Sequence, residues 1–215
     1  YGKPPKRYKL WGRKRPKLPE KSQAYAIMKE NLLRFNKQQK YVFFDFETCG
    51  LNLGSLRNKP WQLAFIVVED ERVVDEADYW LKWDDLKVSK GAAKVTGWTQ
   101  KKYDEKAVSP EQPLKHFEKY LYDDQYLKAG HNLLGFDVYM HGIYRRLLGK
   151  RPDYSYLNQL IDTLCLARAI NNDITLSSSD NLLEWQYKMI SLRKAKGRNK
   201  LIDLCKQYDI RFNAK

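Results

Sequence analysis

Residues 41–50 read YVFFDFETCG, a β-branched and aromatic run that ends in two acids and a glycine turn. Such a composition is typical of a central strand followed by a tight turn. Alternate side chains of a strand share a face, so Asp45 and Glu47 point one way and Phe46 the other. Two carboxylates on a hydrophobic strand repel each other unless a divalent cation such as Mg²⁺ or Mn²⁺ neutralises them. A strand that simply ends in surface acids is the alternative, because an Asp-x-Glu pair is common.

The sequence on either side of this strand predicts an α/β fold with a mixed sheet. Residues 61–68 and 72–83 have the composition of strands, and we expect them to form an antiparallel meander with residues 41–46. Apolar side chains at helical spacing follow in later segments, and one more short strand lies between the first and second of these helices. These elements are a helix over 114–121, a strand over 126–131, and helices over 136–148, around 161–166 and over 199–207.

A third acid follows the predicted strand 126–131. Residues 130–137 read GHNLLGFD, so the strand ends at His-Asn, the chain turns through Gly135, and Asp137 begins a helix. An acid in the first helical turn has the ordinary role of compensating the helix dipole. The same position also directs a carboxylate toward the C-terminal ends of strands, where open α/β sheets bind ligands. Asp137 is therefore a candidate to share one site with Asp45.

Four segments carry a resemblance to known proteins. They are FDFETCG at 44–50, VTGWT at 95–99, HNLLGFD at 131–137 and DTLCLAR at 162–168. In this order they look like motifs of the DEDD exonuclease superfamily (DnaQ-like, ribonuclease H-like), which includes polymerase proofreading subunits and domains, ribonuclease T and oligoribonuclease. The resemblance implies a ribonuclease H-like exonuclease fold, in which helices flank a mixed central sheet whose first three strands are antiparallel.

The resemblance also implies a role for each matching residue. Three acids would bind two Mg²⁺ (or Mn²⁺) ions and act in catalysis: Asp45, Glu47 and Asp137. Four residues would lie beside the 3′-terminal nucleotide or support the site: Thr48, Gly50, Leu51 and Asn132. Asp162 would be structural and would hold the helix that carries Thr163.

The implied activity is that of a 3′→5′ exonuclease. It would hydrolyse phosphodiester bonds at the 3′ end of a single-stranded nucleic acid, with DNA favoured over RNA, and release nucleoside 5′-monophosphates in proofreading or end trimming. The alternative is a nuclease-like subunit that binds nucleic acid or serves in assembly without turnover. A Rossmann enzyme is excluded, because no glycine-rich loop follows the first strand.

Two features depart from the family pattern. The spacing between the His-Asn and Phe-Asp pairs is one residue longer than usual in proofreading subunits, and closer to that of polymerase exonuclease domains and phage relatives. The family's fourth acid and its His or Tyr base are expected shortly after Lys215. These departures leave the subfamily open and keep the inactive alternative in view.

The net charge of +14 is concentrated near the N-terminus, because residues 1–40 hold 13 Lys and Arg against two acids. Prolines predict an extended basic arm over 1–19, followed by a helical lead-in over 20–39. The exonuclease domain would cover 40–215, with an insertion at about 170–198. Phosphate contacts are expected from the arm and from a second basic cluster: Lys14, Arg15, Arg193, Lys194 and Arg198. The arm is also a candidate to dock on a larger polymerase or nucleoprotein assembly.

Apolar runs and cysteines indicate the cellular compartment in which the protein is expected. No apolar run approaches the ~20 residues that span a membrane, so no membrane association is expected. The three cysteines, Cys49, Cys165 and Cys205, form no Cys-x-x-Cys pair, which argues against a zinc site or a disulfide framework. With no signal peptide in the sequence, we expect an intracellular, reducing compartment, either the cytoplasm or the nucleoid.

Overall fold

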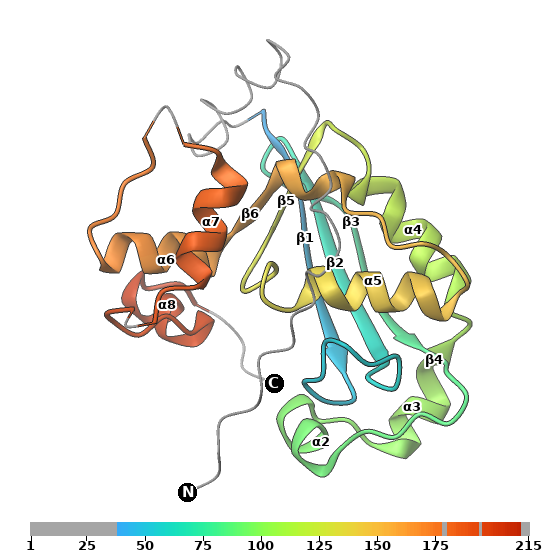
Figure 1. The fold of residues 1–215 in the computed structure, drawn as a ribbon. Coiled ribbons are helices and arrows are strands. Elements are labelled where there is room, and N and C mark those ends of the chain that lie inside the picture. Colours follow the sequence, from blue (N-terminus) through green and yellow to red (C-terminus); the bar gives the residue numbers. More distant parts are fainter. Residues whose placement is uncertain (1–37, 178–179, 194, 212–215) are drawn as a thin grey trace, which may run out of the picture.

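The computed structural model describes residues 38–177, 180–193 and 195–211, which form a sheet with helices packed against it (Figure 1). The predicted basic arm and nearly all of the helical lead-in lie outside the described residues. So do three of the five residues expected to contact phosphates, Lys14, Arg15 and Lys194.

The strands are β1 (Lys40–Thr48), β2 (Pro60–Glu69), β3 (Arg72–Leu81), β4 (Ala107–Val108), β5 (Tyr126–Gly130) and β6 (Leu160–Asp162). They form one sheet in the order β4-β3-β2-β1-β5-β6. β2 pairs antiparallel with both β1 and β3, so the predicted meander is confirmed. β5 runs parallel to β1 and β6, and β4 runs parallel to β3. The predicted mixed α/β sheet is therefore correct.

The helices are α2 (Lys90–Thr96), α3 (Gln100–Lys106), α4 (Glu111–Leu121), α5 (Asp137–Leu147), α6 (Thr163–Asn171), α7 (Leu182–Ile190) and α8 (Leu201–Gln207), with a 3₁₀ turn at Ser155–Gln159. α4 and α5 pack on one face of the sheet, whereas α6, α7 and α8 gather beside β6 (Figure 1). α7 lies in the stretch predicted as an insertion and buries Trp185 and Met189 in the core. No helix of the described residues is long and apolar enough to cross a membrane.

Alternation along β1 separates a core face from an open face. Phe44 and Phe46 are almost fully buried beneath α4, where the Phe117 ring lies 5.0 Å from that of Phe44 and 6.0 Å from that of Phe46. Burying one such aromatic side chain stabilises the fold by ~1.5–3 kcal/mol. Asp45 and Glu47 alternate with these rings and are less buried, as the strand period predicts.

β1 extends beyond its parallel neighbour β5. Their pairing ends with Phe43 opposite Ala129, and residues 44–48 have no strand partner on that side. The chain leaves β5 after Gly130 and turns toward α5, so the two strands diverge at their C-terminal ends. Open α/β sheets bind ligands at such points of divergence. The fold thus places a crevice beside the acids of β1.

The structure differs from the sequence prediction in its short elements. The strands β4 and β6, the helices α2, α3 and α7, and the 3₁₀ turn were not predicted. Ile161 was expected in a helix but lies in β6, because residues 160–162 pair with β5 before α6 begins at Thr163. Elements this short are below the length at which hydrophobic periodicity separates helix from strand.

Candidate active site

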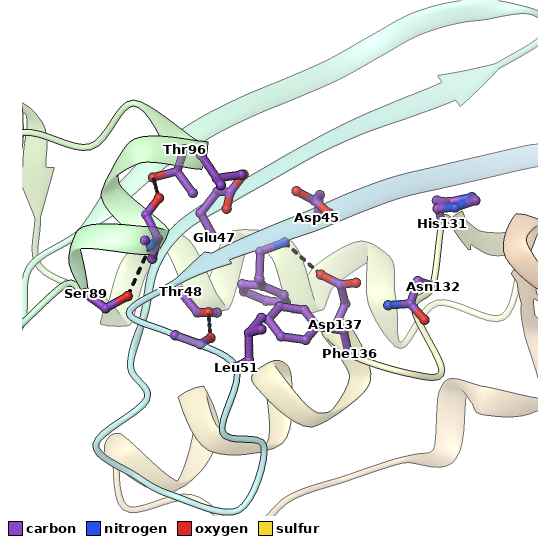
Figure 2. Close-up of a pocket in the computed structure, with 15 residues that line it drawn as sticks. Asp45, Glu47, Thr48, Leu51, Ser89, Thr96, His131, Asn132, Phe136 and Asp137 are labelled. Carbon is purple, nitrogen blue, oxygen red and sulfur yellow. Dashed lines mark hydrogen bonds between the residues drawn. The ribbon is translucent and has the colours of Figure 1, made fainter. Parts of the chain in front are cut away.

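A cleft of about 690 Å³ lies where β1 and β5 diverge. It is lined by all the residues predicted to act in catalysis or to contact the terminal nucleotide: Asp45, Glu47, Thr48, Gly50, Leu51, Asn132 and Asp137. Figure 2 shows that they come from the end of β1, the turn after it, the loop after β5 and the first turn of α5. The fold therefore brings together two sets of residues that are far apart in the sequence.

Asp45 and Glu47 carry the negative charge of the β1 side of the cleft. Burial by the surrounding protein raises the pKa of Asp45, although cleft solvent reaches its side chain. Burial and the charge of Asp45 together raise the pKa of Glu47 to about 7. Neither acid takes part in an ion pair among the described residues. Carboxylates in this situation favour a counter-cation.

Asp137 is the most buried acid of the cleft, with 2% of its surface exposed. Its Oδ1 accepts a hydrogen bond from the Phe46 N–H at 2.9 Å, on the stretch of β1 that β5 leaves unpaired. Burial, followed by the charge of Asp45, raises the pKa of Asp137, and the Phe46 hydrogen bond opposes this rise. Asp45 is thus the common neighbour whose charge acts on both other acids.

The turn that leads into α5 depends on Asn132 and Gly135. Asn132 has a left-handed backbone with φ of 64°, which lets the chain reverse direction after β5. The Gly135 N–H donates to the Asn132 carbonyl at 3.0 Å. A β-carbon at position 135 would lie 2.3 Å from the Asn132 Oδ1, so only glycine fits without displacing that side chain. These two residues position the helix start that carries Asp137.

Asp162 is fully buried and accepts three backbone hydrogen bonds. The donors are the N–H groups of Asn132 at 2.8 Å, Leu134 at 3.0 Å and Leu164 at 2.9 Å. It does not line the cleft. It joins the Asn132 loop to the start of α6, which agrees with the structural role that the resemblance implied.

α2 forms one end of the cleft, and the sequence prediction missed it as part of the site. Its lining residues are Ser89, Gly91, Ala92, Val95 and Thr96 (Figure 2). Leu51 and Val95 are 85% and 86% exposed, so two large apolar side chains are available to a ligand. A helix between a Ser N-cap and a glycine C-cap was a readable signal, since Ser89 and Gly97 bracket the segment.

Of the three histidines, only His131 lines the cleft. Its Nδ1 lies 3.0 Å from the Thr163 Oγ1 at the start of α6. His116 is instead paired with Asp75 at 2.7 Å, and His141 is fully buried beside Glu118. Neither His116 nor His141 lines the cleft, so neither is placed to act on a ligand there.

The second basic cluster lies outside the cleft lining. Arg193 and Arg198 are described, but neither borders the cleft. Burial lowers the pKa of His131, whereas the charge of Asp162 and the backbone of Asn199, the residue after Arg198, act in the opposite direction. Phosphate binding by the two arginines remains a prediction.

Comparison with known proteins identifies the family. The sequence profile of the RNase T family, described as exonuclease, matches residues 42–215. The chain belongs to this exonuclease family. It is thus a member of the DEDD superfamily that the four motifs resembled. No curated protein matches the chain significantly.

Solved structures of exonuclease I share the fold of this exonuclease domain. The zinc-bound E. coli exonuclease I–ssDNA complex has a TM-score of 0.54 and 22% sequence identity, and the match covers 61% of this chain and 29% of the exonuclease I chain. A product-bound exonuclease I has a TM-score of 0.54 and 19% identity over 71% of this chain and 42% of its own. An ExoI/SSB-Ct complex gives a TM-score of 0.54 and 19% sequence identity, and the match covers 71% of this chain and 40% of the other chain. The chain therefore spans less than half the length of these relatives, and the likeness shows a ribonuclease H-like exonuclease fold.

The donor set of the exonuclease cleft fits a hard divalent cation. Asp45, Glu47 and Asp137 supply carboxylate oxygens, the ligands that Mg²⁺ and Mn²⁺ prefer. Among the described residues, no three His, Cys, Asp or Glu side chains are gathered closely enough to hold one ion by themselves. Mg²⁺ is commonly bound by one or two carboxylates and keeps several waters. Asp45 together with either of the other two acids meets that requirement.

Proposed function

We propose that this exonuclease domain hydrolyses the terminal phosphodiester bond at the 3′ end of a single-stranded nucleic acid, releases nucleoside 5′-monophosphates and depends on two divalent cations. The observation that carries the proposal is the meeting of Asp45 and Glu47 from β1 with Asp137 from α5 in one cleft. Their mutual repulsion favours bound cations over a metal-free site.

The position of each acid supports a division of work. Burial, and after it the charge of Asp45, raises the pKa of both Glu47 and Asp137, so Asp45 is the acid that neighbours both others and would hold two cations. Glu47 lies toward α2 and would bind the cation on the side of the attacking water (Figure 2). Asp137 would bind the cation on the opposite side. Bound Mg²⁺ or Mn²⁺ would lower the pKa of a water and stabilise the charge on the leaving 3′ oxygen. The Phe46 N–H keeps Asp137 in place by its hydrogen bond.

The apolar lining of the cleft supports a terminal nucleotide as the substrate. Leu51 and Val95 are highly exposed there, and Phe136 lies beside Asp137 (Figure 2). An aromatic side chain such as Phe136 can stack on the face of an unpaired base with little regard to sequence, and Leu51 and Val95 add apolar surface beside it. The structure of E. coli exonuclease I has been solved in complex with ssDNA. This similarity favours single-stranded DNA as the substrate of this chain. Thr48, Gly50 and Asn132 would lie beside the sugar and the phosphate.

The experiment is a degradation assay on 5′-labelled single-stranded DNA and RNA, with Mg²⁺, Mn²⁺ or EDTA. We expect a metal-dependent ladder that shortens from the 3′ end, and no ladder from Asp45→Ala. A strand blocked at its 3′ end should be resistant, since the reaction begins there. The preferred strand in the same assay assigns DNA or RNA.

The second candidate is a nuclease-like subunit that binds nucleic acid without turnover. One observation favours it: among the described residues, no three His, Cys, Asp or Glu side chains lie close enough together to hold a single ion, although three acids line the cleft. If this candidate is correct, the protein should bind the single-stranded DNA and RNA equally well with and without Asp45→Ala. It should cleave neither substrate at any metal concentration. That result would replace the proposed activity.

A further inference from the structure

α2 is a helix without a core face. None of its seven residues is buried, and four of them line the cleft (Figure 2). Helices of this length are not stable alone, and most are held by a packed apolar side. α2 is held by its ends instead: Ser89 accepts from the Ala92 N–H, and Gly97 closes the helix with φ of 71°. A helix retained without burial indicates a surface that contacts a ligand.

α2 is fixed to the catalytic strand by its own backbone. The Ser89 N–H donates to the Cys49 carbonyl at 3.1 Å, and Cys49 lies in the turn directly after β1. The helix therefore starts beside Thr48 and Gly50, which line the cleft. The start of α2 is thus joined directly to the end of the strand that carries Asp45 and Glu47.

Two adjoining stripes of α2 have different chemistry. Gly91 and Val95 are one helical turn apart and line the cleft. Lys90 and Lys94 are also about one turn apart. Each lysine comes one position before Gly91 or Val95, so the two stripes are separated by ~100° around the helix axis. Both lysines are exposed. A positively charged surface that follows the backbone is characteristic of proteins that bind single strands, and here the exposed Val95 lies beside it.

The lysines of α2, Lys90 and Lys94, form no ion pair with any residue that the structure describes. The first turn of α2 contains no acid, and Lys90 adds a positive charge at the helix N-terminus, where the helix dipole disfavours it. Lys94 lies in the last turn, where the dipole favours a positive charge, so only Lys90 is placed against the local preference. Both lysines are exposed beside the cleft and are available to phosphates.

We propose that Lys90 and Lys94 bind the phosphates of the strand just upstream of the nucleotide in the cleft, and so hold a single strand along α2. This inference rests on the proposed exonuclease function. It assigns the strand path to a different basic surface from the arm and the Arg193–Arg198 cluster. The two lysines position the strand and do not touch the reacting bond.

The test measures strand affinity against salt in EDTA, where metal-dependent cleavage is absent, by fluorescence anisotropy of a labelled single strand. The variant is Lys90→Gln/Lys94→Gln. The matched control is Lys115→Gln/Lys150→Gln, which removes the same charge from exposed positions on α4 and just after α5. Loss of two phosphate contacts lowers the log–log salt slope by about 1.4, so raising salt from about 50 to about 200 mM weakens the wild type ~7-fold more than the variant.

Kinetics separate this inference from the function on which it rests. With a long single strand, the α2 variant should have a higher KM and an unchanged kcat, whereas a dinucleotide, which does not reach the lysines, should be cleaved as by wild type. Equal salt slopes for the α2 variant and the control would overturn the inference, even in an active enzyme. If no protein cleaves any strand, the exonuclease proposal fails while the salt slopes still decide whether α2 binds the strand.

Discussion

Asp137 Oδ1 accepts a hydrogen bond from the Phe46 N–H at 2.9 Å. The bond joins the first residue of α5 to the strand residue that lies between Asp45 and Glu47. It is possible because β5 stops pairing with β1 at Phe43 and leaves the later part of that edge free. One carboxylate oxygen thus replaces a strand partner, and the helix start is locked to the two other acids.

The first prediction separates the structural and chemical roles of Asp137. Asp137→Asn keeps an oxygen that accepts from Phe46, so it should fold normally, whereas Asp137→Ala leaves that N–H unpaired and should be less stable than the Asn variant by about 1–3 kcal/mol. Both should lose at least ~100-fold in exonuclease rate, because neither supplies the negative charge. Urea unfolding and initial rates give the two readouts. A stable, fully active Asp137→Asn would remove Asp137 from catalysis.

The second prediction concerns pH and metal. The pKa of Glu47 in the folded protein is about 7, above its ordinary value of 4.5, so the folded state binds this proton more tightly than the unfolded chain. The associated stability is present at low pH and is lost as pH rises through 7. In EDTA, the Tm should therefore fall between about pH 5 and about pH 8, and added Mg²⁺ or Mn²⁺ should raise it most at the upper end.

Glu47→Gln is the control for this pH dependence. It removes the titrating group and part of the repulsion, so its Tm in EDTA should change less over the same pH range and respond less to metal. A variant with the same pH slope and metal response as wild type would show that Glu47 is not the responsible group. Thermal unfolding by circular dichroism measures both quantities.

The third prediction tests the turn before α5. In Gly135→Ala the new β-carbon displaces the Asn132 side chain, from which it would lie 2.3 Å away. Because Asn132 lines the cleft, kcat/KM should fall ~10-fold or more, as small misplacements in a reacting site do. Gly54→Ala is the control, since its nearest atom would be 3.6 Å away and Gly54 does not line the cleft. Equal activity of both variants would contradict the account of the turn.

The fourth prediction concerns Lys128, a lysine with no exposed surface in β5. Its Nζ donates to the carbonyls of Asp123 at 2.8 Å and Tyr126 at 2.7 Å, and to the Gln159 side chain at 2.7 Å. Lys128→Met removes the donor for all three and should cost about 1–3 kcal/mol of unfolding free energy. The exposed Lys188→Met should stay within about 0.5 kcal/mol of wild type. Urea unfolding that finds the two variants equal would show that the Lys128 contacts are not stabilising.

Long patterns made most of the fold readable from the sequence. The alternation of Phe44, Asp45, Phe46 and Glu47 predicted both the buried face of β1 and the shared face of the acids. The run from His131 to Asp137 predicted a strand end, a turn and a helix start, and the structure has all three. Patterns of this kind persist because burial on one side of an element selects residues at a fixed period.

The remaining features depend on contacts between distant segments. The sequence does not reveal that β5 ends early and leaves the Phe46 N–H to Asp137, because this follows from strand register. α2 was missed because it buries no side chain and so has no apolar period. The His131–Thr163 contact likewise joins two segments whose proximity is set only by the pairing of β5 with β6.

The most direct measurement is the release of the 3′-terminal mononucleotide from a 3′-labelled single strand in Mn²⁺, by wild type, Asp45→Asn and Asp78→Asn. Asp78 is an exposed acid of β3 outside the cleft and is the matched control. The account predicts rapid release by wild type and Asp78→Asn, with a rate at least ~100-fold lower for Asp45→Asn. Release by Asp45→Asn at the wild-type rate, or by none of the three proteins, would contradict it.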